Sequence, residues 1–283
     1  MSEKKFKFGL IGTSRVGTSI AWHLKKVGHT PVFVWNRSES GLDKARNYLK
    51  FQNQLTDFAE LPEIDVVIIS VSDDAIQPVA EKIAKHNNDL SNTLILHNSG
   101  FHSSHILQSL SKIGAQTGSL HPVISMPSIA EGIRIIPETV FTCEGEAEIE
   151  LKRIADQIGR KGIIIDRKQK TYIHLAAVFV NNHVTTLIAA IKSLLEEKGV
   201  DSQDSSEILQ KLSLQAANTW GQSLEKSLTG PVVRKDSETI KGHIKLLDNH
   251  PNLQEIYKKF VDLTVDLLSD DNRSLIEAVK KLK

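Results

Sequence analysis

The sequence predicts an α/β protein in which a doubly wound parallel sheet is followed by an all-α region. The first 165 residues alternate strand-like and helix-like segments, the pattern of a sheet covered by helices on both faces. Some strand-like segments, such as Val66-Val67-Ile68-Ile69, are unbroken apolar runs, which is typical of strands buried on both faces. After Asp166 the strand signals disappear, and apolar residues recur at helical spacing to the C-terminus.

Each element is expected in order along the chain. Strands are predicted at 6–11, 31–35, 66–71, 93–97, 115–120, 140–142 and 162–165, with helices near 17–28, 39–50, 74–87, 102–113 and 146–159. Beyond residue 166, helices are predicted at 169–198, 205–228, 236–248, 252–268 and 271–282. The second of these stops at Thr229-Gly230-Pro231 because proline lacks the N–H that a helix needs. We therefore expect two domains, 1–166 and 167–283.

Composition excludes several classes of protein. The net charge of +1 provides no basic surplus for nucleic-acid phosphates, and the 11 histidines form no recognisable metal-ligand pattern. The one cysteine, Cys143, lies in a strand-like segment and is expected to be a buried structural thiol. The N-terminus has no signal-peptide pattern, and the clean apolar runs are short, so we expect a soluble, cytoplasmic protein with no membrane partner.

A glycine turn between the first strand and the first helix is the strongest functional signal. A tight turn at a helix start directs backbone N–H groups and the helix dipole at an anion, as in dinucleotide-binding units. Serine replaces the middle glycine of the usual pattern, so it must adopt a compatible φ or contribute a hydroxyl hydrogen bond. A purely structural turn is the alternative. The residues that we predict to hold a cofactor here are Gly12, Thr13, Ser14, Arg15, Val16 and Gly17.

The residues after the second strand indicate which dinucleotide binds. No acidic residue is present there to bind a ribose diol; the chain reads Asn36-Arg37-Ser38 instead. These side chains are donors suited to a 2′-phosphate, and the Arg37 guanidinium matches that anion in shape. The sequence therefore predicts an NADP(H) site, with Arg15 as a second phosphate-binding candidate.

Polar residues follow three further strands. Ser72 and Asp73 first indicate a helix start, but with Val71 they should also lie along the cofactor, because ligands bind at the carboxyl ends of such strands. The same rule places Asn98, Ser99 and His121 at that edge. Asn98 and Ser99 can hydrogen-bond a carboxamide or a substrate carbonyl. His121 is either a turn residue or a group for proton transfer.

The long helix after residue 166 presents Lys170 and His174 one turn apart, and Asn182 continues near that face. These polar groups either pair across a helix interface or point at the nicotinamide ring, with Lys170 or His174 as proton donor. Farther on, Thr229, Arg234 and Lys235 provide a hydroxyl and two cations around a helix start. That arrangement is either a simple turn or a substrate carboxylate site.

Taken together, these motifs resemble the family that joins a Rossmann-like domain to a DUF2520 domain, within the wider 6-phosphogluconate dehydrogenase and pyrroline-5-carboxylate reductase group. The resemblance rests on segments spread along nearly the whole chain: Arg15-Val16-Gly17, Trp35-Asn36-Arg37-Ser38, Ser70-Val71-Ser72-Asp73-Asp74, His97-Asn98-Ser99-Gly100, Ser119-Leu120-His121-Pro122, Ala176-Ala177-Val178-Phe179 with Asn182, and Leu228-Thr229-Gly230-Pro231-Val232-Val233-Arg234.

The resemblance implies a Rossmann-type domain and an NADP(H)-dependent oxidoreductase whose helical C-terminal domain forms a homodimer. Some members resemble PanG-type ketopantoate reductase, so the leading expectation is reduction of a small keto acid. A pyrroline-5-carboxylate-like imino acid and a non-enzymatic NADP(H) sensor are the alternatives. The sequence departs from the pattern at Ser14, at Lys235, where many relatives have glycine, and at the Lys-x-x-x-Asn pair, which here is Lys170 followed by His174.

Overall fold

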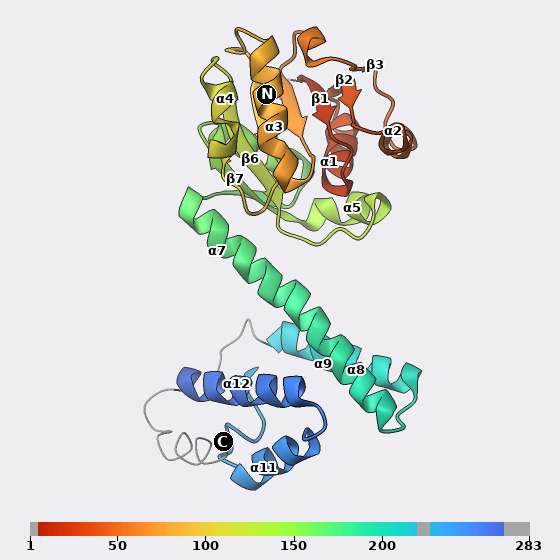
Figure 1. Ribbon diagram of the computed structural model, residues 1–283, viewed down its shortest axis with the longest axis vertical. Coiled ribbons are helices and arrows are strands. Elements are labelled where there is room, and N and C mark those ends of the chain that lie inside the picture. The colour runs from red at the N-terminus through yellow and green to blue at the C-terminus, as the bar shows by residue number, and fades with distance from the viewer. Residues whose placement is uncertain (1–4, 220–226, 269–283) are drawn as a thin grey trace. The chain divides into compact units, whose positions relative to one another are not determined.

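The computed structural model describes residues 5–219 and 227–268. The chain forms two compact units, Met1–Asn182 and His183–Lys283. The first unit is built on an eight-stranded sheet in the order β3-β2-β1-β4-β5-β6-β7-β8, with helices on both faces (Figure 1). The domain boundary that the sequence predicts near residue 166 stays a prediction.

The elements of the first unit alternate as expected. Its strands are β1 (Lys7–Ile11), β2 (Thr30–Trp35), β3 (Asn53–Gln54), β4 (Val66–Ile69), β5 (Leu94–His97), β6 (Gln116–Pro122), β7 (Val140–Gly145) and β8 (Lys161–Ile164). Its α-helices are α1 (Arg15–Lys26), α2 (Glu39–Arg46), α3 (Asp73–His86), α4 (Gln108–Ser111), α5 (Ile129–Ile135), α6 (Glu148–Ile158) and α7 (Arg167–Ala177). Short 3₁₀ turns are η1 (Phe58–Glu60), η2 (Ser104–Leu107) and η3 (Ile136–Glu138).

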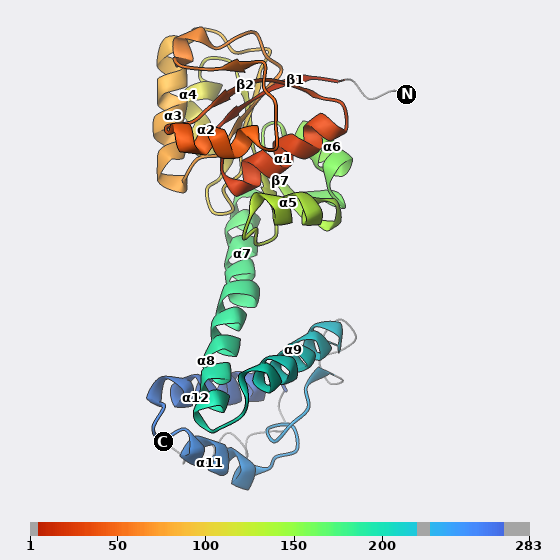
Figure 2. The same cartoon turned by 90° about the vertical axis from the view of Figure 1, so that its right-hand side faces the viewer.

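Alternate residues of each central strand face opposite sides of the sheet, which creates two cores. In β4, Val66 and Ile68 join one apolar cluster, and Val67 and Ile69 join the other. Helices α1 and α6 cover the first cluster, while α3 and α4 cover the second (Figure 1, Figure 2). The doubly wound architecture predicted from the sequence is therefore confirmed.

The sheet is not parallel throughout. Strand β7 runs antiparallel to β6, and Phe141 near its start pairs with Pro122 at the end of β6. The connection between them contains α5, which packs on α1: His23 Nε2 donates to the Ile133 carbonyl at 2.8 Å. Strand β8 runs parallel to β7, so both of these strands run opposite to the other six, and the expectation of a parallel sheet is wrong at this end of the sheet.

Other differences concern short elements. The sequence analysis missed β3 and α5, whose two and seven residues are too few to show a periodicity. The region predicted as one helix at 102–113 is divided into η2 and α4. The backbone before η2 is held by the Ser99 side chain, which accepts a hydrogen bond from the Phe101 amide. The helix predicted at 271–282 lies outside the described residues, as do 220–226 of the helix predicted at 205–228.

In the second unit, the described helices are α8 (Val184–Glu197), α9 (Ser202–Thr219), α11 (Ser237–Leu246) and α12 (Pro251–Leu267). Helices α11 and α12 share an apolar cluster formed by Ile240, Val261 and Val265. Helix α7 continues through a π-helical turn, η4 (Val178–His183), into α8, so 31 residues from Arg167 to Glu197 are helical without a break.

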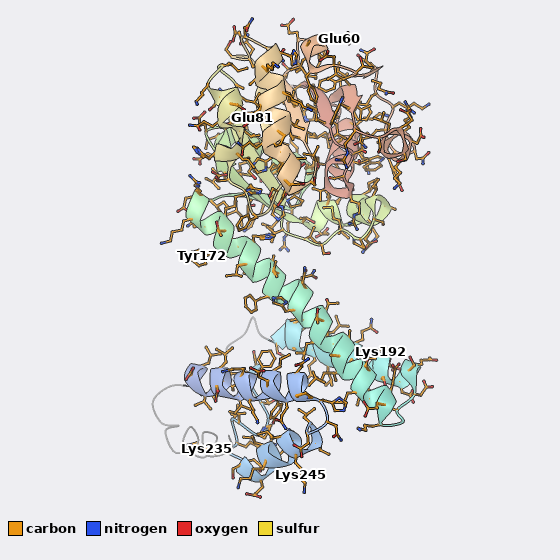
Figure 3. All side chains as sticks on the ribbon, in the orientation of Figure 1. Glu60, Glu81, Tyr172, Lys192, Lys235 and Lys245 are labelled. Atoms are coloured by element: carbon orange, nitrogen blue, oxygen red, sulfur yellow. The ribbon has the colours of Figure 1, made fainter. Side chains whose placement is uncertain are left out.

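By length and composition this continuous helix could cross a membrane, and its most apolar window is not buried in the described structure. The uninterrupted apolar runs in the sequence are too short to indicate this property. Figure 3 shows Tyr172 projecting from α7, where 61% of the residue is exposed.

Candidate active site

The glycine turn is packed against the end of β4 so closely that larger residues do not fit. Gly12 has a φ of 85°, and a Cβ there would lie 2.4 Å from the Ser70 carbonyl oxygen. A Cβ at Gly17 would lie 2.3 Å from the Ser70 Cβ. Both glycines therefore allow α1 to begin directly against the sheet, which is how a phosphate cradle is formed.

Ser14, which stands where the usual pattern has its middle glycine, both adopts a compatible φ and contributes a hydroxyl hydrogen bond. Its φ is −61°, which any residue can adopt, and its hydroxyl caps α1 by accepting from the Gly17 amide at 3.1 Å. The same Oγ lies 2.6 Å from the Ser70 Oγ. Among the described residues, the backbone N–H groups just before and within the first turn of α1 have no partner. These are the N–H groups of Thr13, Ser14, Arg15 and Val16.

The three residues after β2 divide into two roles. The Asn36 amide donates to Thr13 Oγ1 at 2.6 Å, and its oxygen accepts from the Arg37 amide at 2.8 Å. Asn36 therefore links β2 to the glycine turn, and its side chain is not free for a ligand. The Arg37 guanidinium is exposed and has no partner among the described residues. Ser38 caps α2 by accepting from the Gly41 amide at 3.3 Å.

Two further groups of residues that were predicted to bind the cofactor lie at the same edge of the sheet. Arg15 donates to the Pro127 carbonyl at 2.9 Å, so it holds the loop before α5 and is a weaker phosphate candidate than Arg37. Val71, Ser72 and Asp73 follow β4, with Ser72 as the N-cap of α3. Their position at the carboxyl end of a central strand is consistent with the predicted path of the cofactor.

A second cluster forms beside the carboxyl ends of β5 and β6. The rings of His121 and His174 meet edge to face, with centroids 6.4 Å apart. Phe101 packs similarly against His174, with centroids 6.0 Å apart. Gly100 lies between the two imidazoles, because a Cβ there would be 2.6 Å from His174 Nδ1 and 2.8 Å from His121 Nε2. The structure thus brings together residues that are far apart in the sequence.

A Gly100→Ala substitution tests whether this close approach matters. The added methyl group would displace one or both imidazoles, so we expect about a tenfold loss of turnover with folding retained. The measurement is steady-state NADPH oxidation together with a thermal melt. A Gly242→Ala variant is the control, because a Cβ at Gly242 has nothing within 4 Å. Unchanged turnover in Gly100→Ala would exclude a catalytic role for this contact.

His121 is neutral at pH 7 and presents an acceptor. Burial, followed by the charge of Lys170, lowers its pKa to about 4. Its Nδ1 lies 3.1 Å from the Asn98 carbonyl, which can only accept, so Nδ1 carries the proton and Nε2 is left as an acceptor. His121 therefore cannot donate to a carbonyl in this state. It can accept from an O–H or an N–H group.

Lys170 is the buried cation of the site, with 2% of its surface exposed. Its Nζ donates to the Ser99 carbonyl at 2.8 Å and to Ser119 Oγ at 2.7 Å. Burial lowers the pKa of Lys170 to about 8, and Glu144 and Asp73 oppose part of that shift. At pH 7 this ammonium is still mostly protonated, and one of its three N–H bonds remains available for a ligand.

Asn98 and Ser99 support the cluster from the end of β5. The Asn98 amide donates to the Leu120 carbonyl at 2.7 Å, whereas its Oδ1 is buried without a partner among the described residues. An orphaned acceptor of this kind suits an N–H donor such as a carboxamide. Ser99 Oγ accepts from the amides of Phe101 and His102, so it holds the loop rather than projecting into open space.

His97, which precedes Asn98, is a buried group that sequence reasoning did not single out. It is fully buried, and burial followed by the charge of Lys170 lowers its pKa to about 3. Its Nδ1 accepts from the Ser99 amide at 3.1 Å. The ring therefore stays neutral and fixes the backbone that carries Asn98 and Gly100.

This pKa predicts a pH dependence of stability. A histidine whose pKa is depressed in the folded state stabilises the fold above its ordinary value of 6.5. That contribution is lost as the pH falls from 6.5 toward 3. We expect His97→Asn to show a smaller loss of unfolding free energy between pH 7 and pH 4 than the native protein, measured by urea unfolding. The exposed His86→Asn variant should match the native protein, and equal losses in all three would contradict the prediction.

Several predicted residues lie elsewhere. Asn182 is eight residues beyond His174, which is about 12 Å along a helix. Thr229, Arg234 and Lys235 belong to the second unit, where Lys235 is the one described non-glycine residue with a positive φ, 58°. That conformation explains why glycine would suit this position. The carboxylate of Asp236 caps α11 by accepting from the Thr239 amide at 3.1 Å, and so occupies the helix start expected for a substrate carboxylate.

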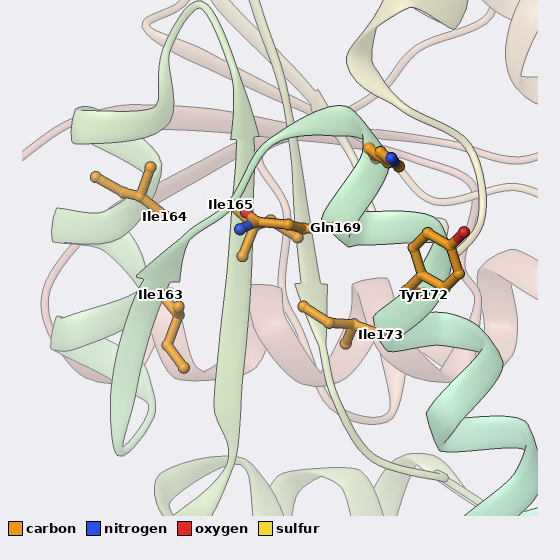
Figure 4. A pocket seen from close by; sticks show the side chains of 7 residues that line it. Ile163, Ile164, Ile165, Gln169, Tyr172 and Ile173 are labelled. Carbon is orange, nitrogen blue, oxygen red and sulfur yellow. The ribbon is translucent and has the colours of Figure 1, made fainter.

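One apolar hollow of about 430 Å³ does not coincide with this polar chemistry. It lies between β8 and α7, and Figure 4 shows isoleucine side chains from the strand and Tyr172 and Ile173 from the helix around it. Among the residues that the structure describes, no three potential metal ligands come together. The polar clusters at the strand ends are therefore the better candidate for catalysis.

Family models match both parts of the chain. Residues 1–122 match a Rossmann-like domain, and residues 139–264 match a domain of unknown function, DUF2520. The N-terminal part of the chain is therefore similar to a Rossmann-like domain, and the C-terminal part is similar to a DUF2520 domain. This finding confirms the resemblance predicted from the sequence motifs. No curated protein matches the chain.

Solved structures share the fold of both domains. A candidate NADP oxidoreductase from Bacteroides fragilis is 22% identical, with a TM-score of 0.74 over 92% of this chain and 98% of that one. A reductive aminase from Aspergillus terreus, in complex with NADPH and ethyl levulinate, is 16% identical, with a TM-score of 0.62 over 97% and 99%. The pyrroline carboxylate reductase of Plasmodium falciparum, with NADP bound, is 14% identical, with a TM-score of 0.57 over 98% and 97%.

Proposed function

We propose that this protein is an NADP(H)-dependent oxidoreductase that reduces a small keto or imino acid. The observation that carries the proposal is a buried, protonated Lys170 at the same sheet edge as a phosphate cradle of unpaired N–H groups. A reductase needs a hydride source and a proton donor side by side, and this edge provides a place for each. Neighbours of the same fold that were solved with NADPH or NADP support the choice of cofactor.

The residues present fit NADP(H). The free N–H groups of residues 13–16 suit the pyrophosphate, and Arg37 with Ser38 suits the 2′-phosphate. The buried Asn98 Oδ1 suits the amide hydrogens of a carboxamide. When bound, this cofactor supplies a hydride.

Lys170 then provides the proton. As the substrate carbon gains a hydride, negative charge develops on its oxygen or nitrogen, and the third N–H of Lys170 is available to that atom. After transfer, Lys170 is a neutral amine, the form that burial favours. His174 borders the same space but is only partly buried. We therefore propose Lys170 as the donor and His174 as a residue that shapes the site.

Two substrate classes belong to this proposal. The leading one is a small keto acid, with ketopantoate reduced to pantoate as the first choice. The second is an imino acid of the pyrroline-5-carboxylate kind. It is favoured by two acceptors at the site, Asn98 Oδ1 and His121 Nε2, because a protonated imine carries an N–H whereas a ketone does not. For either class, the side chains of Thr229, Arg234 and Lys235 remain the proposed carboxylate-binding groups, without the start of α11, which Asp236 occupies.

The test is to follow NADPH absorbance with a panel that includes ketopantoate, other 2-keto acids and pyrroline-5-carboxylate. Turnover with NADPH and one member of the panel would support the proposal. Tight NADPH binding without turnover on any member would instead favour an NADP(H) sensor. Oxidation of NADH alone would contradict the assignment of Arg37.

We also propose that the protein is a homodimer formed through its helical region. The long helix exposes large apolar side chains that a soluble protein normally covers, namely Tyr172, Leu175, Val180 and Val184. A Leu175→Asp variant is expected to shift the mass measured by light scattering from dimer to monomer, while the change Asn88→Asp at an exposed position of the first unit serves as its control. A monomeric native protein at micromolar concentration would contradict the proposal.

A further inference from the structure

A groove of about 370 Å³ lies on the first unit beside the histidine cluster. Its walls come from three elements that are distant in sequence: Gln77 of α3, Phe101 and His105 from the segment after β5, and Arg167 and Thr171 of α7. Phe101 is shared with the candidate active site, because its ring also packs against His174. The groove therefore begins where the proposed reacting centre ends.

Two side chains of this groove lack protein partners. Arg167 is exposed and has no ion pair or hydrogen bond among the described residues, and the side chain of His105 is likewise without a described partner. Three other described arginines, by contrast, form ion pairs with carboxylates. Arg46, for example, pairs with both Glu39 and Asp43. An unneutralised guanidinium beside a hollow is the arrangement that binds carboxylates and phosphates.

The surrounding charges restrict where an anion can lie. A second hollow of about 300 Å³ adjoins the groove and shares Gln77 and His102 with it. That hollow is lined by Asp73, Asp74 and Glu81, the last of which is labelled on α3 in Figure 3. These carboxylates repel an anion from their side of His102. Only the other end of the groove, where Arg167 and Thr171 lie, attracts an anion.

The spacing along α7 defines the length of a suitable ligand. Arg167 and His174 are seven residues apart, which is about 10 Å along a helix and places them on nearly the same face. A keto acid whose carboxylate adjoins its ketone cannot span that separation. A longer carbonyl compound with a second anionic group at its far end can.

We propose that this groove is a substrate subsite, in which Arg167 and Thr171 bind the distal carboxylate or phosphate of a carbonyl substrate whose reacting end lies in the space bordered by His121 and His174, where Lys170 is the proposed proton donor. The inference rests on the proposed function and narrows its substrate class to acids with two separated anionic groups. Arg167 would then determine specificity without taking part in proton transfer.

The first test is a binding measurement that needs no turnover. Suberate, octanoate and octyl phosphate are titrated by calorimetry into the native protein, Arg167→Gln and Lys168→Gln. Lys168 is the matched control because it is the next residue of α7, carries the same charge and lines the apolar hollow instead. We expect Arg167→Gln to weaken the binding of suberate by about 10- to 100-fold, as for a lost charge-assisted hydrogen bond. Lys168→Gln should change the affinity for suberate little.

Octyl phosphate distinguishes the two anions. Tighter Arg167-dependent binding of octyl phosphate than of suberate would assign a phosphate, and the reverse would assign a carboxylate. No binding of either ligand to the native protein, or equal weakening by both substitutions, would overturn the subsite.

The second test separates the subsite from the reaction. With 2-oxosuberate as substrate, Arg167→Gln should raise KM about tenfold or more and leave kcat unchanged, whereas KM for 2-oxooctanoate should not change. If no keto acid is turned over but suberate binding still depends on Arg167, the proposed reaction fails and the anion site stands. If both keto acids are affected equally, the subsite is wrong and the reaction stands.

Discussion

Replacing Lys170 with methionine is expected to reduce turnover by about 10²- to 10⁴-fold, the usual contribution of a positioned proton donor. NADPH affinity should stay within about twofold of native, because the phosphate cradle lies at a different strand end. Methionine fills a similar volume but carries no proton. The fold should survive, since removing a buried charge also removes its desolvation cost.

The same assignment predicts a pH profile. The pKa of Lys170 is lowered to about 8 by burial, so the ammonium form is present below that value and is lost as the pH rises through it. Reduction should therefore slow above pH 8 in the native enzyme. In the Lys170→Met variant, the residual rate should not fall as the pH rises above 8.

Lys168→Met is the matched control, because it removes the same charge two residues earlier in α7, where the side chain is exposed. It should retain native turnover and the native pH profile. A Lys170→Met enzyme with native turnover would assign the proton donor elsewhere, with His174 as the next residue to replace. A melt or circular dichroism spectrum for each variant distinguishes lost chemistry from lost folding.

Replacing Arg37 with glutamine is expected to weaken NADPH binding by about 10- to 100-fold and to leave NADH binding unchanged. The two coenzymes differ by the 2′-phosphate, and an exposed guanidinium after β2 is free to bind it with two parallel hydrogen bonds. Fluorescence titration with both coenzymes gives the ratio directly. Since the contact is electrostatic, the NADPH advantage of the native protein should also shrink at high salt.

Arg46→Gln provides the comparison for this substitution. Arg46 also lies in the α2 region, but Glu39 and Asp43 neutralise it, so its loss should affect neither coenzyme. If Arg37→Gln weakened NADH and NADPH equally, Arg37 would contact a group that both share. If it weakened neither, the 2′-phosphate would bind elsewhere, with Arg15 as the remaining cation at this edge.

Much of the fold was predictable because it depends on local patterns. Apolar runs such as Val66-Val67-Ile68-Ile69 identify strands buried on both faces, and both cores use alternate residues of that run. The antiparallel direction of β7 was not predictable, since apolar periodicity identifies a strand but not the direction in which it runs beside its neighbour.

The sequence predicted which residues form the candidate site better than it predicted the role of each residue. Asn36 and Arg37 are adjacent, and both were expected to bind a phosphate. Only the structure shows that Asn36 is committed to Thr13 while Arg37 remains free. Similarly, His121 was expected to be a turn residue or to transfer a proton. Burial makes it neutral instead, and its contact with the Asn98 carbonyl leaves Nε2 as an acceptor.

The sequence by itself determined the order of the α/β and all-α regions, the strands of the first region other than β3, and the glycine turn that opens α1, because each is a property of neighbouring residues. Tertiary structure alone decided which polar groups are buried, and hence their charge. Lys170 is one turn of helix from His174, yet only Lys170 is enclosed, by the backbone of Ser99 and the hydroxyl of Ser119. Desolvation acts on the whole environment of an ion, and that environment is assembled from three distant parts of the chain.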